Sequence, residues 1–272
     1  MFHLSPIILN DQEAETTGTE GPIDVALTVA MADLKTGFID PEKGLVHYER
    51  IRDSQAFDRY KSLANGLRSF DLRSLERREQ RIAFWINIYN TAVIHGVIEL
   101  GISRSVKEVP GFFHRITYTI GGYDFSLDEI EHGILRANRR PPYRLFRPFS
   151  KKDPRLEFIV NPPDLRIHFA LVCGAKSCPP ISFYEADQVD FQLQLAAMSF
   201  INSPQVKVLP EERSVLISRI FEWYRSDFME GGRDLIHILL EYLDESEKKA
   251  FLRENSDRIR IKYQPYDWNL NQ

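Results

Sequence analysis

The sequence predicts an α+β fold: a single domain in which a small, mostly antiparallel sheet packs on a long buried helix, with further helices around it. Two observations predict this class. The stretch Arg81–Leu100 (RIAFWINIYNTAVIHGVIEL) is apolar on nearly all sides, which is typical of a central helix enclosed by protein. Residues 115–120 alternate between apolar and polar side chains and end at Gly121-Gly122, which predicts a hairpin in the sheet.

The composition is that of an ordinary globular protein. The chain has 272 residues, of which 43% are hydrophobic and 27% are charged, and both fractions are average. The net charge of -4 gives no global attraction to nucleic acid, and no apolar run approaches the roughly 20 residues of a membrane span. Two cysteines are too few for a disulfide framework. We therefore expect a cytoplasmic protein without a cofactor. The sequence leaves undecided whether the two cysteines form a single disulfide with each other.

The elements before the central helix follow from helical spacing and turn residues. Residues 1–21 have little apolar content after Leu9 and are expected to be a mobile leader, followed by one domain from residue 22 to residue 272. Helical spacing then predicts three stretches, the last of them highly charged: Ile23–Gly37, Glu49–Ala64 and Asp71–Arg81.

Three polar side chains interrupt the apolar surface of the central helix. Asn87, Asn90 and His95 must be buried with partners or face a cavity, because an unpaired buried amide costs roughly 1–3 kcal/mol. Asn87 and Asn90 share a face, where they either tie the helix to a loop or orient a substrate. Trp85 and Tyr89 flank Asn87, and this trio is more typical of the wall of a binding site than of a plain core.

After the hairpin, a second helix and a long connection are predicted. Ser126 and Glu129 have the spacing of a capping box, so a helix should continue through His132 to about Asn138. Glu129 and His132 either lie on an ordinary surface helix or contact a substrate. The next segment, Arg139–Pro163, is rich in Arg, Pro and Phe, and connections of this length are uncommon unless they are functional.

The stretch Leu165–Ile181 (LRIHFALVCGAKSCPPI) carries the strongest functional signal. Its alternating start predicts a β-strand bearing His168, and its Gly- and Pro-rich end predicts a loop bearing Cys173 and Cys178, the two cysteines of the chain. Imidazole and thiol are the side chains best suited to nucleophilic or metal chemistry near neutral pH. Lys176 is a nearby cation that would favour the thiolate of Cys178, so Cys178 is the preferred reactive sulfur.

The rest of the chain alternates short helices and strands. Trp268, close to the end of the sequence, indicates that the tail is docked on the protein. The predicted helices are Asp187–Ile201, Ile220–Phe228, Leu235–Leu243 and Glu247–Glu254, and the predicted strands are Gln205–Leu209, Ser214–Ile217 and Ile259–Tyr263.

Four motifs together resemble those of DUF547, a protein family of unknown function. They are Phe84–Asn90 (FWINIYN), Phe125–His132 (FSLDEIEH), His168–Pro180 (HFALVCGAKSCPP) and Tyr266–Asn271 (YDWNLN). The resemblance is strong from about Ala83 to Ile181 and weaker in the tail. It implies a fold grouping and a site rather than a particular reaction.

The order of a buried helix followed by a histidine-bearing strand is also distantly similar to papain- and transglutaminase-like folds. In those folds a cysteine at the start of a helix is activated by a histidine on a strand. The central helix of this chain carries Asn87 and Asn90 but no cysteine. A nucleophile would therefore have to be Cys173 or Cys178.

These residues are compatible with three functions. The first is a thiol-dependent hydrolase or acyl transferase acting on an amide or ester of a small molecule or peptide. Its nucleophile would be Cys178 or Cys173, with His168 as general base. Asn87 or Asn90 would orient the substrate or donate to the oxyanion.

The second function is a non-catalytic protein-binding or scaffold domain, in which the same polar residues form a buried network and the Arg/Pro/Phe connection meets a protein partner. The third is a zinc site at His168, Cys173 and Cys178, although this spacing matches no standard zinc pattern. The ordinary alternatives are a core histidine satisfied by a neighbour and a small buried Cys173 at the end of a strand.

Overall fold

The computed structural model describes residues 5–11, 23–40 and 44–272, which divide into two compact units. The first contains the chain up to Asp164, Leu171–Asp190 and Trp268–Gln272; the second contains Leu165–Ala170 and Phe191–Asp267. Each unit combines helices with a small sheet, so the predicted α+β class is confirmed. Most of the predicted leader lies outside the described residues, and a single domain from residue 22 stays a prediction.

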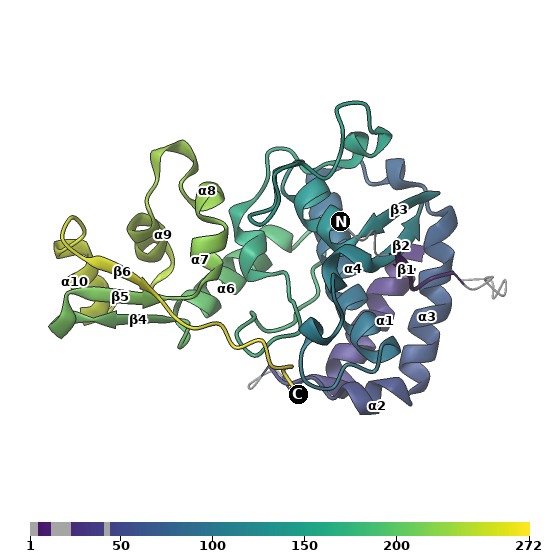
Figure 1. The fold of residues 1–272 in the computed structure, drawn as a ribbon, viewed down its shortest axis with the longest axis horizontal. Helices are drawn as coiled ribbons and strands as arrows, with labels where there is room; N and C mark the ends of the chain where they lie inside the picture. Colours follow the sequence, from purple (N-terminus) through teal and green to yellow (C-terminus); the bar gives the residue numbers. More distant parts are fainter. Residues whose placement is uncertain (1–4, 12–22, 41–43) are drawn as a thin grey trace. The chain divides into compact units, whose positions relative to one another are not determined.

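The first unit is built around α4 (Arg78–Glu99), the predicted central helix. Every residue from Ile82 to Ile98 is buried, because α1, α2, β2 and a π-helix all pack against α4. Figure 1 shows α4 inside this group of elements. A helix that is apolar on all sides is stable when it is enclosed in this way. The other α-helices of the unit are α1 (Ile23–Phe38), α2 (Tyr48–Arg52), α3 (Gln55–Gly66) and α5 (Phe112–Arg115).

The sheet of the first unit has the strand order β1 (Ile7–Ile8), β2 (Ile116–Ile120), β3 (Tyr123–Ser126). β1 runs parallel to β2, and β2 runs antiparallel to β3 across the predicted hairpin. Gly121 and Gly122 form the turn with φ of 58° and 79°, a region that glycine enters without steric cost. The predicted hairpin is therefore confirmed.

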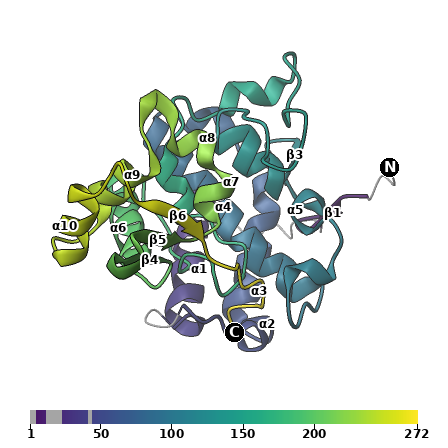
Figure 2. The same cartoon turned by 60° about the vertical axis from the view of Figure 1, so that its left-hand side comes forward.

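The second unit packs helices on a separate sheet with the order β4, β5, β6. β4 and β5 are the predicted antiparallel hairpin, and β6 lies parallel to β5. Figure 2 shows this sheet with α6, α9 and α10. The core is rich in phenylalanine: Phe221 and Phe228 lie with their ring centroids 5.0 Å apart. The elements are α6 (Val189–Ile201, its first two residues in the first unit), β4 (Val206–Leu209), β5 (Ser214–Ile217), α7 (Ile220–Trp223), α8 (Arg225–Phe228), α9 (Leu235–Tyr242), α10 (Glu247–Glu254) and β6 (Arg260–Tyr263).

Two predictions about strands and three about helices were wrong. The charged stretch Asp71–Arg81 is a short 3-10 helix, Leu72–Ser74, followed by the start of α4, and the stretch Ile220–Phe228 is divided into α7 and α8. One mostly antiparallel sheet was expected, whereas the described residues form two mixed sheets. The strand expected at the start of Leu165–Ile181 is a 3-10 helix, Leu165–Phe169. All residues from Ile167 to Val172 are buried, and an apolar run buried on every side does not reveal its period. The helix expected over 49–64 is split into α2 and α3 by Ser54, whose hydroxyl caps α3 by accepting from the Phe57 N–H at 3.1 Å.

The helix after the hairpin is a π-helix, Glu129–Leu135. The predicted capping box starts it: the Ser126 N–H donates to Glu129 Oε2 at 2.9 Å, and the Glu129 N–H donates to the Ser126 hydroxyl at 3.3 Å. π-Helices are rare and are frequently found at functional sites. No helix among the described residues is long and apolar enough to span a membrane.

A close contact fixes the end of this π-helix. A Cβ placed on Gly133 would lie 2.4 Å from a ring carbon of Phe149. The ring cannot move aside easily, because both backbone groups of Phe149 are held at 3.0 Å by the side-chain amide of Asn138. Gly133 is therefore required by packing rather than by its backbone conformation.

We predict that Gly133→Ala lowers the free energy of unfolding by about 1–3 kcal/mol through overpacking against Phe149. Urea denaturation measures the change. The control is Gly37→Ala, at a helical glycine whose added Cβ would meet nothing within 4 Å, and which should be neutral or slightly stabilising. An equal effect of the two substitutions would contradict the packing argument.

Candidate functional site

The two cysteines are joined to each other in the first unit. Cys173 and Cys178 form a disulfide, and neither is a free thiol. The Cys173 N–H also points at the Cys178 Sγ, 2.9 Å away. A disulfide holds no thiolate, so this form of the protein has no sulfur nucleophile or sulfur metal ligand.

Asn90 holds the segment on both sides of the disulfide against α4. Its side-chain oxygen accepts from the Val172 N–H at 3.1 Å, and its amide nitrogen donates to the Ser182 carbonyl at 3.2 Å. One helical turn earlier, Asn87 accepts from the Tyr184 N–H and donates to the Tyr184 carbonyl, each at 2.8 Å. Both asparagines tie α4 to an irregular segment, which was the simpler of the two roles predicted for them.

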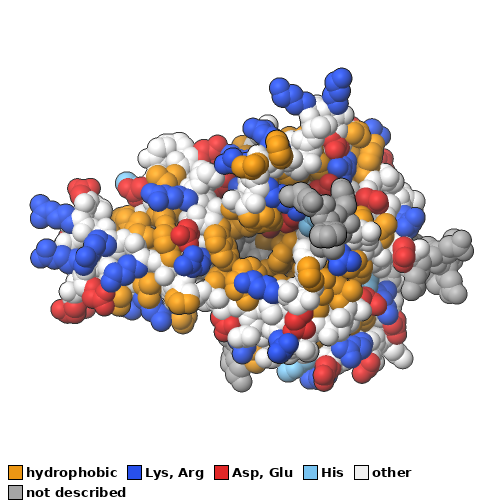
Figure 3. Space-filling model, viewed as in Figure 1, with side chains coloured by type: hydrophobic (Ala, Val, Ile, Leu, Met, Phe, Trp, Pro, Cys, Tyr) orange, Lys and Arg blue, Asp and Glu red, His pale blue; other side chains and the backbone are white. Residues whose placement is uncertain are grey.

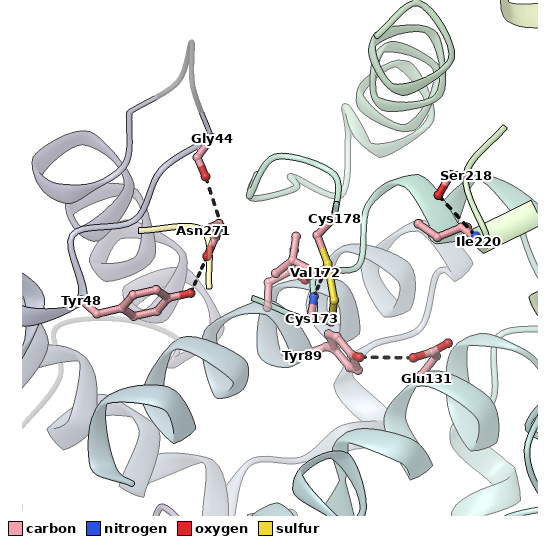
Figure 4. The surroundings of a disulfide bond; sticks show 11 residues. Gly44, Tyr48, Tyr89, Glu131, Val172, Cys173, Cys178, Ser218, Ile220 and Asn271 are labelled. Carbon is pink, nitrogen blue, oxygen red and sulfur yellow. Dashed lines mark hydrogen bonds between the residues drawn. A yellow bond between two sulfur atoms is a disulfide. The ribbon is translucent and has the colours of Figure 1, made fainter. Parts of the chain in front are cut away.

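The end of the chain holds the same segment from another direction. The Asn271 N–H donates to the Gly174 carbonyl at 3.0 Å, and the Lys176 N–H donates to the Asn269 carbonyl at 2.8 Å. Tyr48 donates from its hydroxyl to Asn271 Oδ1 at 2.8 Å, as Figure 4 shows. The predicted docking of the tail is therefore confirmed.

A buried acid lies among the residues that surround the disulfide. The Tyr89 hydroxyl donates to Glu131 Oε2 at 3.2 Å, and Figure 4 shows this pair together with Cys173 and Cys178. Glu131 comes from the π-helix and Tyr89 from α4, and both are buried. The contact between these two helices thus brings an ionisable side chain to the disulfide segment.

His132, the next residue, belongs to a chain of polar contacts in the same unit. Arg136 Nη1 lies 2.8 Å from His132 Nδ1, and His132 Nε2 lies 3.2 Å from the Tyr143 hydroxyl. Because a guanidinium only donates, Nδ1 must accept, which assigns the ring proton to Nε2. Nε2–H therefore donates to Tyr143, which in turn donates to Asp128 Oδ1 at 2.5 Å. The imidazole is neutral, and both of its nitrogens are used.

Tyr143 reaches this network from an exposed loop. The residue is 62% exposed, yet its hydroxyl lies between Asp128 and His132. Burial of the hydroxyl, with the negative charges of Asp128 and Glu131 as further causes, raises the pKa of Tyr143 well above its ordinary value. Tyr143 therefore acts as a neutral donor at any physiological pH.

His168 lies in the second unit, whereas both cysteines lie in the first. Its Nε2 is 3.0 Å from Asp227 Oδ2, and both side chains are buried. Its ring stacks on Tyr224 with a centroid distance of 3.9 Å. A histidine oriented by a carboxylate in this way is half of the arrangement that thiol and serine enzymes use.

The predicted substrate-binding residues are dispersed. Trp85 is fully buried against Phe125, 4.8 Å between ring centroids, and its indole N–H has no partner among the described residues. Glu129 caps the π-helix and pairs with Arg155 at 3.1 Å. Only Lys176 has an exposed side chain. The structure thus joins Tyr89 and His132 to one buried polar region and leaves Trp85 in the core.

The structure does not support the zinc alternative. The sulfurs of Cys173 and Cys178 are bonded to each other, so neither is a thiolate that could bind zinc. Within the described ranges, no group of three or more His, Cys, Asp or Glu side chains is arranged to hold a metal ion. His95, the third polar residue of the central helix, is a core residue whose Nδ1 lies 2.7 Å from the Tyr118 hydroxyl.

An apolar groove of about 320 Å³ lies beside Asn87 in the first unit. Val25 and Val29 of α1, which are 56% and 47% exposed, and Phe84 of α4 are among the residues that line it. Asn87 and Tyr184 also line it. Asn87 is among the residues that line this groove, whereas Trp85 and Tyr89 are not, so a binding-site wall made of the three residues stays a prediction.

Sequence reasoning missed four residues of these networks: Asp128, Arg136, Tyr143 and Asp227. Arg136 follows His132 by one helical turn, which is a local signal that could have been used. Asp227 lies 59 residues from His168, and no spacing rule connects the two. Tyr143 could not be singled out, because only the fold of its loop brings its hydroxyl to His132.

Residues 72–201 match the family described as protein of unknown function, DUF547. The resemblance indicated by the motifs is therefore confirmed. No curated protein matches the chain, and no solved structure matches its fold.

We predict that Asn87→Ala lowers the free energy of unfolding by about 2–4 kcal/mol, because two backbone groups of Tyr184 lose their partners. Chemical denaturation measures this. Asn255→Ala is the control, since Asn255 makes one side-chain hydrogen bond, to the Phe251 carbonyl of its own helix, and should change stability by less than about 1 kcal/mol. A negligible effect of Asn87→Ala would show that the two hydrogen bonds between Asn87 and the Tyr184 backbone do not stabilise the fold.

His95 should make stability depend on pH. Burial first, and the charge of Lys61 second, lower the pKa of His95 from 6.5 to about 3. Below pH 6.5, His95 therefore binds a proton in the unfolded chain but stays unprotonated in the folded protein. As the pH is lowered from 6.5 to 3, the free energy of unfolding falls by up to ~1.4 kcal/mol per pH unit. Urea denaturation of His95→Gln should give a flatter pH dependence in this window, while the exposed control His114→Gln should retain the original slope. Parallel curves would contradict this assignment.

Proposed function

We propose that this chain, whose residues 72–201 are a DUF547 domain, is a thiol-dependent hydrolase or acyl transferase acting on an amide or ester. The observation that carries the proposal is the buried pair His168–Asp227, with 3.0 Å between Nε2 and Oδ2. A histidine base held by a carboxylate supplies two of the three members of a catalytic triad. His168 also precedes Cys173 by only five residues in the chain.

In this proposal the Cys173–Cys178 disulfide is the resting form, and a dithiol or phosphine reductant is needed to release the nucleophile. The Cys178 thiolate then adds to the substrate carbonyl, and the C–N or C–O bond breaks. The general base that takes the thiol proton passes it to the leaving group, and His168 stays the sequence-based prediction for this base. Water or another acceptor cleaves the thioester and restores the thiol.

The other predicted residues take supporting roles. Asn87 and Asn90 position the segment that bears the cysteines, since their amides already bind its backbone. A donor role toward the oxyanion stays a prediction for both. The exposed Lys176 is the member of the predicted substrate-binding set best placed to meet an acidic group of a substrate.

The distant similarity to papain- and transglutaminase-like enzymes supports this reaction class by analogy alone. Those enzymes place the cysteine on a helix, whereas α4 carries asparagines at that point. The proposed nucleophile of this chain therefore lies in a loop instead of on a helix. The analogy concerns the roles of the residues rather than the fold.

A non-catalytic binding domain is the second candidate. It is favoured by the pairing of both buried asparagine amides of α4, those of Asn87 and Asn90, with backbone groups. It is also favoured by the exposed side chains of Leu145 and Phe146, which are 80% and 82% exposed in the Arg/Pro/Phe connection. Exposed apolar patches commonly mark binding surfaces.

Redox state and single substitutions distinguish the two candidates. We predict that the reduced chain hydrolyses p-nitrophenyl acetate and that the oxidised chain does not. Cys178→Ser should abolish the activity, whereas Cys173→Ser should be active without reductant, because no bridge can form. His168→Ala should lower kcat/KM by roughly 10²–10⁴.

The matched control is His114→Gln, which removes an exposed imidazole and should leave the rate unchanged. Equal rates with and without reductant, or equal behaviour of the two cysteine variants, would count against a thiol nucleophile. No activity in reduced protein would favour the binding domain.

A further inference from the structure

The loop Arg139–Lys152, called the basic loop below, differs sharply in charge from the rest of the chain. The whole chain has a net charge of -4, yet the basic loop contains no Asp or Glu. Its cations are Arg139, Arg140, Arg144, Arg147, Lys151 and Lys152. This concentration of positive charge creates a positive electrostatic potential around the loop, although the net charge of the whole chain is negative.

The same loop exposes its largest apolar side chains. Leu145 and Phe146 are 80% and 82% exposed, the highest values among the exposed large hydrophobic residues, and Tyr143 next to them is 62% exposed. Figure 3 shows Lys and Arg side chains beside exposed hydrophobic ones along the upper edge of the view. Two adjacent apolar side chains in water are unfavourable unless something covers them.

The backbone of the basic loop is nevertheless held in place. Asn138 clamps Phe149 at one end, and Arg136 Nη1 donates to the Arg140 carbonyl at 3.3 Å near the other. Between these ends, Tyr143 is bound to Asp128 at 2.5 Å. Leu145 and Phe146 therefore lie between backbone segments that hydrogen bonds hold in place.

Most cations of the loop are available to a partner. Arg144 lies 3.3 Å from Asp128, but Arg140, Arg147, Lys151 and Lys152 are exposed and form no ion pair with any other described residue. None of the described residues of the first unit forms an ion pair with these four side chains. Their charges are thus free to meet an anionic surface.

We propose that the basic loop binds the surface of an anionic lipid bilayer, with Leu145 and Phe146 inserted below the headgroups and the surrounding cations on the lipid phosphates and carboxylates. Exposed apolar side chains flanked along the chain by Lys and Arg combine the two contributions to membrane-surface binding, which are burial of apolar area and attraction to anionic lipid. The inference does not depend on thiol chemistry, and it names a partner for the second candidate function.

A bilayer fits the loop better than an acidic protein partner. Leu145 and Phe146 do not line the groove beside Asn87, and two adjacent, highly exposed apolar side chains suit a lipid surface into which they can insert. The chain is acidic overall, so an anionic membrane repels its other faces and attracts this one. These two features together orient the first unit with the loop toward the lipid.

Co-sedimentation of the full chain with vesicles tests the proposal. We expect binding to phosphatidylcholine vesicles containing about 30% phosphatidylserine, weakening as salt is added, and little binding to pure phosphatidylcholine. Leu145→Ser combined with Phe146→Ser should weaken binding by at least about tenfold. Arg140→Gln and Arg147→Gln should each weaken it by about fivefold, which corresponds to ~1 kcal/mol per charge.

Two sets of controls separate lipid binding from loss of fold. Phe191→Ser with Leu195→Ser removes apolar side chains that are 60% and 47% exposed on α6, and Lys207→Gln with Arg258→Gln removes exposed cations of the second unit. Both should bind vesicles as the unsubstituted chain does. All loop variants should keep the original Tm, since the substituted side chains lie in solvent.

Equal sedimentation with the two kinds of vesicle, or unchanged binding by the loop variants, would overturn the proposal. Absence of sedimentation accompanied by loop-dependent binding to polyglutamate would also overturn it and assign the loop to an acidic protein. None of these outcomes affects the esterase test, which measures the cysteines alone.

Discussion

The structure of the first unit depends on one repeated interaction, in which a buried asparagine amide replaces a neighbouring strand. The oxygen of the side chain accepts from a backbone N–H and its nitrogen donates to a backbone carbonyl of a distant segment, so both groups are satisfied as in a β-ladder. An irregular segment can then be buried without unpaired polar groups, which would each cost roughly 1–3 kcal/mol. The pairs with both bonds to a single residue are Asn10–Thr119, Asn87–Tyr184 and Asn138–Phe149.

These clamps decide where functional groups can lie. Asn87 and Asn90 hold the segment that contains the disulfide along α4, and the neighbouring π-helix contacts the same helix. As a result, Glu131 reaches Tyr89 in the surroundings of the cysteines. Asn138 does the same for the basic loop, which stays ordered at its ends while its tip remains in solvent. Buried polar residues of this kind specify one arrangement of loops, because any shifted arrangement would leave their backbone partners unpaired.

How much could be predicted depended on whether the signal was local. The hairpin at Gly121-Gly122 and the capping box at Ser126 are each specified within a few residues, and both were predicted correctly. The run around His168 was not, because it is buried on every side and therefore carries no period that separates a strand from a helix. His168 was singled out for its chemistry, yet its partner Asp227 lies on a helix far along the chain. Sequence reasoning consequently identified His168 as a candidate site residue but not its partner Asp227.

The sequence alone determined the α+β class, the buried central helix and the membership of residues 72–201 in DUF547, because apolar periodicity and short motifs are properties of neighbouring residues. Only the tertiary structure decided that Cys173 and Cys178 are bonded, that His132 is a neutral member of a network ending at Asp128, and that His168 belongs to another unit than the sulfurs. The physical reason is that a hydrogen bond or a disulfide depends on where distant backbone segments meet. A local sequence pattern does not predict which distant segments come into contact.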